Sequence, residues 1–227
     1  LPHQLYVTNE ISSRGLPRAL LADEVGLGKT IEASWILHRL LVTGRIQRVL
    51  IIVPETLVNQ WFVELFKRFN LSFWVPSSQS GDEGPITAED LVDQEHVILS
   101  LESLAELRAQ GAFDEAKWDL VIVDEAHRVS WSEEIASAEY QTLEALARQS
   151  PGLLLLTATP EQLGLEGHFS RLHLLDPHRF PSLSAYLKEH TRYEGIAQLA
   201  EELLSEKGLS GKNSQKLKKL LDEKVTP

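Results

Sequence analysis

The chain has 227 residues and a mass of 25.5 kDa, enough for one large domain or for one domain with a smaller appendage. Its formal net charge of −11 at pH 7 argues against a module that grips nucleic acid by bulk positive charge, although a local surface or another domain can still supply such contacts. The absence of cysteine excludes disulfides and thiolate metal sites, and it fits a reducing compartment.

Short apolar runs alternate with longer amphipathic ones along the first 178 residues. The apolar runs predict strands at residues 18–22, 48–54, 96–100, 118–125 and 152–159. The amphipathic runs predict helices at residues 29–44, 56–69, 101–110 and 133–149, and Thr56 is the expected N-cap of the second. Strands that are apolar on both faces and are each followed by a helix indicate a parallel sheet that helices cover on both faces.

Two segments lack this alternation. Residues 76–95 are polar, acidic and rich in turn-forming residues, so we expect a long surface loop there. After about residue 178 the strand candidates stop and the pattern is helical, with a lysine-rich end that is most simply a solvated helix face. We therefore expect an α/β domain over residues 1–178 and a helical extension over residues 179–227.

The stretch LLADEVGLGKT, residues 20–30, is close to a phosphate-binding loop. That loop needs Gly, four residues and then Gly-Lys-Ser/Thr; Gly28, Lys29 and Thr30 supply the end, whereas Asp23 stands in place of the first glycine. Backbone N–H groups near Gly26 and Gly28 would hold phosphate oxygens, Lys29 would reach the β- and γ-phosphates, and Thr30 would offer a hydroxyl to Mg²⁺. The alternative is a glycine turn that caps a helix and leaves Lys29 exposed.

The stretch LVIVDEAH, residues 120–127, is a buried strand that ends in two acids. Ligands bind at this carboxyl edge in open parallel sheets. Asp124 is suited to hold Mg²⁺ through water, and Glu125 to polarise the water that attacks the γ-phosphate. The alternative is a strand that simply ends in polar residues.

These motifs together resemble a known family. ADEVGLGKT, IIVPETLVNQW, VIVDEAH and LTATP occur in the order found in superfamily-two helicase-type ATPases, and an acid in place of the first glycine is typical of their Swi/Snf branch. Within that branch the resemblance is greater still to bacterial ATPases associated with RNA polymerase, and it covers about residues 1–180. It implies a RecA-like P-loop NTPase lobe that binds ATP and Mg²⁺ and couples ATP hydrolysis to translocation on duplex DNA.

The resemblance also implies roles for individual residues. Gln4 reads the adenine edge, and His127 senses the γ-phosphate rather than binding metal. The nucleotide-binding loop comprises Asp23, Glu24, Val25, Gly26, Leu27, Gly28, Lys29 and Thr30. Contacts to the tracked strand come from Pro54, Glu55 and Thr56, and coupling to movement from Thr157 and Thr159. Trp61 and Trp118 are expected in the core, because apolar residues flank them; the place of Trp131 is left open.

Such a motor closes ATP between two RecA-like lobes, and the second lobe supplies arginine fingers. Only about 68 residues follow Thr159, too few for that lobe, so we expect the isolated chain to be nearly inactive as an ATP hydrolase. Methionine is absent even at position 1, which indicates a fragment, a processed chain or an engineered version. No apolar run approaches the roughly 18–20 residues that cross a bilayer, so we expect no membrane partner.

Two other functions remain open at this stage. One is a nucleotide-controlled protein-binding module with little hydrolysis, which the presence of Lys29, Thr30, Asp124 and Glu125 disfavours. The other is an RNA helicase lobe of the Asp-Glu-Ala-His type, which the DEVGLGKT variant and LTATP disfavour. The resemblance favours a bacterial, cytoplasmic and nucleoid-associated protein, with RNA polymerase, duplex DNA and the second lobe as partners.

Overall fold

The computed structural model describes residues 2–13, 15–22, 28–76, 86–157 and 164–204, without the side chains of 2–5 and 198–204. The chain separates into two compact units, Leu1–Phe180 and Pro181–Pro227. The second unit contains the helix α8 (Leu183–Leu204). Within the part of the chain that the structure describes, no helix is both long and apolar enough to cross a membrane.

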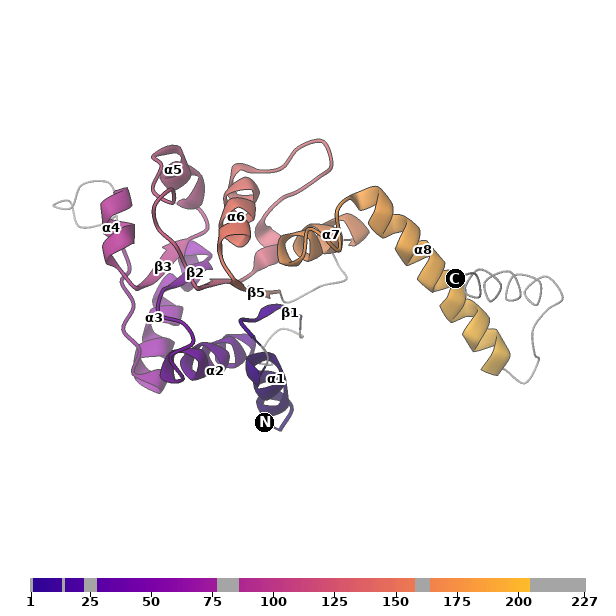
Figure 1. Cartoon of the computed structure of the whole chain (residues 1–227), viewed down its shortest axis with the longest axis horizontal. Helices are drawn as coiled ribbons and strands as arrows, with labels where there is room; N and C mark the ends of the chain where they lie inside the picture. Colours follow the sequence, from indigo (N-terminus) through magenta and orange to yellow (C-terminus); the bar gives the residue numbers. More distant parts are fainter. Residues whose placement is uncertain (1, 14, 23–27, 77–85, 158–163, 205–227) are drawn as a thin grey trace. The chain divides into compact units, whose positions relative to one another are not determined.

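A parallel sheet of five strands forms the centre of the described part of the first unit (Figure 1). Its order is β1 (Arg18–Leu21), β5 (Gly152–Leu156), β4 (Leu120–Val123), β2 (Val49–Val53) and β3 (His96–Ser100). All residues of β2, β4 and β5 are buried. Each strand lies inside a predicted apolar run, which confirms both the strands and the parallel sheet.

Helices cover both faces of this sheet (Figure 1). One face carries α1 (Pro2–Ser13), α2 (Lys29–Val42) and α3 (Glu55–Phe69). The other carries α4 (Ala88–Asp93), α5 (Leu104–Ala109), α6 (Ala138–Gln149) and α7 (Gly164–Leu175). Alternate strand residues serve the two cores: Ile51 packs with α2 and α3, whereas Ile52 packs with the opposite group. Each such buried side chain contributes about 1.5–3 kcal/mol.

The prediction of a surface loop over residues 76–95 is wrong at its end, because α4 forms there. Thr87 begins this helix with a capping box: its Oγ1 accepts a hydrogen bond from the Asp90 N–H (3.3 Å), and its own N–H donates to Asp90 Oδ2 (2.7 Å). The apolar side of the helix buries Leu91. A helix of six residues is too short to display a helical period in the sequence.

The predicted bounds of three helices also need correction. The helix α3 begins at Glu55 with Pro54 as its N-cap, so Thr56 lies inside the first turn and is not the cap. The carboxylate of Glu102 takes the capping role, since it accepts a hydrogen bond from the Glu55 N–H (3.0 Å). The helices expected at 101–110 and 133–149 are shorter than predicted, and Ser137 caps α6 by accepting from the Tyr140 N–H.

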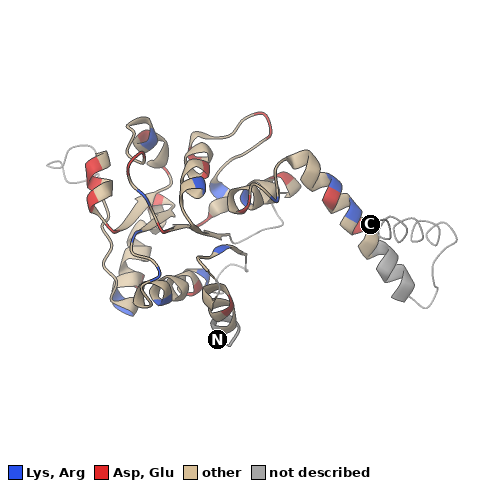
Figure 2. Ribbon diagram, viewed as in Figure 1, with Lys and Arg blue, Asp and Glu red and all other residues tan. Residues whose placement is uncertain are grey.

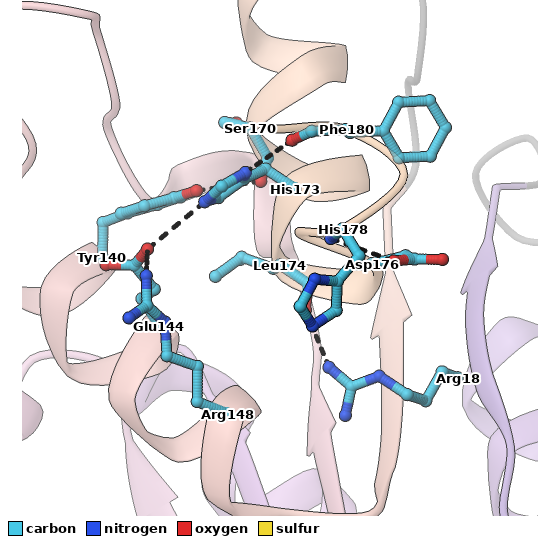
Figure 3. Close-up of polar contacts among 10 residues, drawn as sticks. All are labelled: Arg18, Tyr140, Glu144, Arg148, Ser170, His173, Leu174, Asp176, His178 and Phe180. Atoms are coloured by element: carbon cyan, nitrogen blue, oxygen red, sulfur yellow. Dashed lines mark hydrogen bonds and ion pairs between the residues drawn. The ribbon is translucent and has the colours of Figure 1, made fainter. Parts of the chain in front are cut away.

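Arg18 fastens α7 to the amino edge of the sheet (Figure 3). Its Nε donates to the Leu175 carbonyl (2.7 Å) and its Nη2 to the Leu174 carbonyl (2.8 Å), at the end of α7 where a cation is favoured. Its Nη1 donates to the Ser150 carbonyl (2.7 Å), just before β5. Burial lowers the pKa of Arg18, and the nearby Asp176 opposes that shift. Arg18 thus joins β1, β5 and α7 by one guanidinium.

Polar side chains also join α6 to α7 (Figure 3). The Tyr140 hydroxyl donates to the Ser170 carbonyl (3.0 Å), and burial raises the pKa of this phenol. His173 lies with Nε2 3.3 Å from Glu144 Oε1 and Nδ1 2.7 Å from the Phe180 carbonyl oxygen. These contacts hold α7, the helix that follows the LTATP motif, against α6.

Candidate nucleotide site

The helix α2 starts directly at the predicted phosphate loop. Gly28 is its N-cap and has φ 89° and ψ 32°, a left-handed conformation that glycine adopts without a Cβ clash. The carbonyl of Gly28 accepts the first helical hydrogen bond from the Glu32 N–H (3.0 Å). Lys29 is only 9% exposed, so the alternative of a turn with an exposed lysine is wrong. A helix start of this kind directs backbone N–H groups and positive dipole charge toward an anion.

The carboxyl end of β4 places Asp124 in a defined orientation. Asp124 is 6% exposed, and both oxygens of its side chain accept a hydrogen bond. The N–H of Glu125 donates to Oδ1 (2.8 Å), and the indole Nε1 of Trp61 donates to Oδ2 (2.8 Å). The sequence predicted Trp61 in the core, which its 1% exposure confirms, but gave no sign of this bond across 63 residues.

Glu125 has an unusual backbone. Its φ of 49° and ψ of 43° lie in the left-handed region, which is costly for a residue with a Cβ and persists where the surroundings enforce it. Its Oε2 lies 3.0 Å from Nδ1 of His127, and that nitrogen lies 3.4 Å from Oγ1 of the buried Thr157. A polar chain therefore connects the ends of β4 and β5.

One cavity of about 290 Å³ brings the two motifs together. It is lined by Gly28, Lys29, Thr30 and Ile31 at the start of α2, by Leu57, Gln60, Trp61 and Glu64 of α3, and by Asp124 and Glu125 after β4. The wall from α3 was not anticipated, because nothing in its helical period distinguishes a site-facing side from a core-facing side. A hydroxyl at Thr30 and a carboxylate at Asp124 are hard oxygen donors of the kind that suit Mg²⁺.

The remaining predicted residues divide into two groups. Pro54 lies between β2 and α3, at the same carboxyl edge of the sheet, and Glu55 and Thr56 are exposed residues of the first turn of α3. Outside the described residues lie Asp23, Glu24, Val25, Gly26, Leu27 and Thr159, and the side chain of Gln4 is not described either.

A larger cavity, of about 650 Å³, opens elsewhere, beside Arg18, Arg148 and Phe180. It lies near the amino edge of the sheet, where Arg18 begins β1, and none of the motif residues lines it. The smaller cavity is therefore the better candidate for a nucleotide, because the loop lysine and the strand-end acids converge there.

The fold is that of a RecA-like P-loop NTPase lobe, and the chain belongs to the SNF2-related domain family, whose model matches residues 11–224. It is 49% identical to the RNA polymerase-associated protein RapA of Vibrio cholerae serotype O1 (strain M66-2), over 98% of this chain and 23% of that protein. RapA of Serratia proteamaculans (strain 568) is 48% identical over the same shares. The chain thus spans about a quarter of the length of these relatives.

Solved structures agree on the fold. The Sulfolobus solfataricus SWI2/SNF2 ATPase core in complex with dsDNA matches with a TM-score of 0.65 and 21% identity, over 82% of this chain and 37% of that one. The core domain of the same ATPase matches with a TM-score of 0.63 and 22% identity, over 82% and 36%. The predicted RecA-like lobe is confirmed.

Proposed function

We propose that the chain is the ATP-binding lobe of a DNA-translocating SNF2-family ATPase that acts on RNA polymerase and hydrolyses ATP to ADP and phosphate. The observation that carries this proposal is the cavity shared by Gly28, Lys29 and Thr30 with Asp124 and Glu125. A cation at a helix start and two acids at a strand end are the parts that phosphoryl transfer from ATP requires.

Four of the residues that line the cavity have tasks in this proposal. The ammonium of Lys29 would bind the β- and γ-phosphates, and Thr30 and Asp124 would hold Mg²⁺. Mg²⁺, when bound, neutralises charge on the phosphate oxygens. Glu125 orients the attacking water and accepts its proton.

In this proposal His127 and Thr157 transmit the presence or absence of the γ-phosphate from the site to the end of β5. His127 contacts both the Glu125 carboxylate and the Thr157 hydroxyl, so a change at Glu125 reaches the end of β5 through a single imidazole. Thr159 extends this path in the proposal, and Gln4 with residues 23–27 completes the nucleotide contacts.

The partners follow from the relatives and from the sheet edge. RapA is described as RNA polymerase-associated, and the solved archaeal core was bound to dsDNA, which supports both as partners of a cytoplasmic, nucleoid-associated protein. Pro54, Glu55 and Thr56 would contact the tracked strand locally. Figure 2 shows acidic residues on α4 and residues of both signs on α2 and α6. Residues 1–178 form the lobe and residues 179–227 lead toward the second lobe.

Substitution of Lys29 by alanine tests the proposal. Lys29→Ala removes the cation aimed at the phosphates and should weaken binding of a fluorescent ATP analogue about 10- to 100-fold, the range of a charge-assisted hydrogen bond. Lys67→Ala, which removes an exposed lysine of α3, is the matched control and should bind as the unmodified chain does. Equal affinities for Lys29→Ala and Lys67→Ala would contradict the proposal.

A further inference from the structure

Trp61 belongs to the apolar core and to the nucleotide cavity at once. The residue is 1% exposed and packs in the core between α2, α3 and the sheet. It also lines the cavity, where its indole N–H donates to Asp124 Oδ2 over 2.8 Å. Both partners are buried, and a hydrogen bond from a fixed donor to a carboxylate is strong under those conditions.

The bond removes the rotational freedom of the Asp124 carboxylate. The torsion that turns a carboxylate is broad, so one donor leaves its plane poorly defined. Here the Glu125 N–H holds Oδ1 and the Trp61 indole holds Oδ2, so the plane is fixed from both ends. Each oxygen keeps a further lone pair for another donor or for a metal.

We propose that Trp61 is a positioning residue for the metal ligand Asp124: it holds the carboxylate in the orientation that receives hydrated Mg²⁺. This inference rests on the proposed function, because it assigns Trp61 a task at the same site. Groups that hydrogen-bond to a metal-ligating side chain and orient it typically contribute a factor of about 10–100 in metal affinity.

Trp118 supplies a matched control. It is buried to nearly the same degree, at 2% exposure, but it packs in the core on the other face of the sheet. Its indole nitrogen has no hydrogen-bond partner among the described residues, and its ring lies under the guanidinium of Arg48 (5.0 Å). Trp118→Phe therefore removes a buried indole without touching Asp124.

The experiment measures the Mg²⁺ concentration that half-saturates binding of a fluorescent ATP analogue. Trp61→Phe and Trp118→Phe are compared with the unmodified chain. A third variant carries β-(3-benzothienyl)alanine at position 61, which keeps the bicyclic ring and replaces the N–H by sulfur. We expect both changes at position 61 to raise the required Mg²⁺ about 10- to 100-fold. Trp118→Phe should match the unmodified chain both with Mg²⁺ and in the presence of a chelator.

The outcomes separate the inference from the proposed function. Failure of the unmodified chain to bind the nucleotide would overturn the proposed function and this inference with it. A normal Mg²⁺ requirement in the benzothienyl variant, beside Mg²⁺-dependent binding by the unmodified chain, would overturn the inference alone. In an Asp124→Ala background, Trp61→Phe should cause no further rise in the Mg²⁺ concentration required. A full additional rise would show that Trp61 does not act through Asp124.

Discussion

Asp124 and Glu125 are neighbours in the chain but are constrained in different ways. Asp124 is held through its side chain, by donors on both oxygens, whereas Glu125 is held through its backbone in the left-handed region. A non-glycine residue in that region costs about 1–2 kcal/mol, and such cost is usually found where a side chain must point in one direction. The direction here is toward His127 and the cavity.

The role of Glu125 can be tested by Glu125→Gln. In the complete enzyme proposed above, this variant should bind Mg²⁺ and ATP but hydrolyse ATP about 10²–10⁴-fold more slowly, because an amide does not accept the proton of water. Single-turnover hydrolysis measures the effect. Glu115→Gln, at an exposed position, removes an equal charge and should leave the rate unchanged. Rapid hydrolysis by Glu125→Gln would remove Glu125 from its role as base.

At the residue scale the sequence predicts the site residues that follow strands, but it does not predict the hydrogen-bond donor that α3 supplies to Asp124. Lys29, Thr30, Asp124 and Glu125 were expected together because parallel strands bring their carboxyl ends to one edge. The bond from Trp61 to Asp124 was not expected, because it depends on how α3 is rotated against the sheet. Helix rotation is set by packing, which a single sequence pattern does not encode.

Among the elements, the short helix α4 and the long-range hydrogen bonds of Arg18 are two features that the sequence pattern does not predict. The strands were predicted well, since buried parallel strands are continuous apolar runs bounded by turn residues. The capping box of α4 was present in the sequence as Thr87 and Asp90, but the surrounding polar residues obscured it. The contacts of Arg18 join residues more than a hundred positions apart, as in its bond to the Ser150 carbonyl.

The cap of α4 should depend on pH. The Thr87 backbone N–H and then its hydroxyl lower the pKa of Asp90. Because the folded-state pKa is below the unfolded one, the stabilisation is present above about pH 3.9 and is lost as the pH falls through the folded pKa. Amide hydrogen exchange in α4, corrected for the intrinsic rate, should therefore accelerate at acid pH. Thr87→Ala should show the faster exchange already at neutral pH; equal exchange in the two proteins there would contradict the capping role.

The three hydrogen bonds that the Arg18 guanidinium donates are called the Arg18 clip, and their loss should destabilise the first unit. Arg18→Met keeps the aliphatic stem but leaves three carbonyls without their donor, and we expect a loss of about 1–2 kcal/mol in the free energy of unfolding, the residue being partly exposed. Urea denaturation measures it. Arg148→Met is the control: that side chain is 62% exposed and makes an i,i+4 ion pair with Glu144, of the kind that contributes about 0.5 kcal/mol or less. Equal losses in the two variants would contradict the clip.

At the scale of the whole molecule, the site has a wall on one side only in our proposal. The described part supplies the loop lysine and the strand-end acids, and the second RecA-like lobe would supply arginines from the opposite side. In related enzymes an arginine at the transition state contributes about 10³–10⁵ in rate. The same division applies to the binding of duplex DNA, because the second lobe would form half of the protein groove that holds the duplex.

The isolated chain should accordingly bind adenine nucleotide weakly, and duplex DNA should barely raise its ATPase rate. Phosphate release is measured with and without DNA, for this chain and for full-length RapA of Vibrio cholerae as the positive control. A net charge of −11 gives the chain little bulk attraction to DNA. Turnover equal to that of the full-length relative would show that a complete active site lies within these 227 residues.

The place of β1 in the sheet also determines when the site can form during synthesis. Of the five described strands β1 is synthesised first, yet its hydrogen-bonding partner is β5, with Arg18 opposite Leu153. At about 5–20 residues per second, β5 follows on the order of ten seconds later, after β2, β3 and β4 have been made. During that interval β1 lacks the strand with which it pairs. In our proposal, ATP can stabilise this lobe only once β5 has left the ribosome.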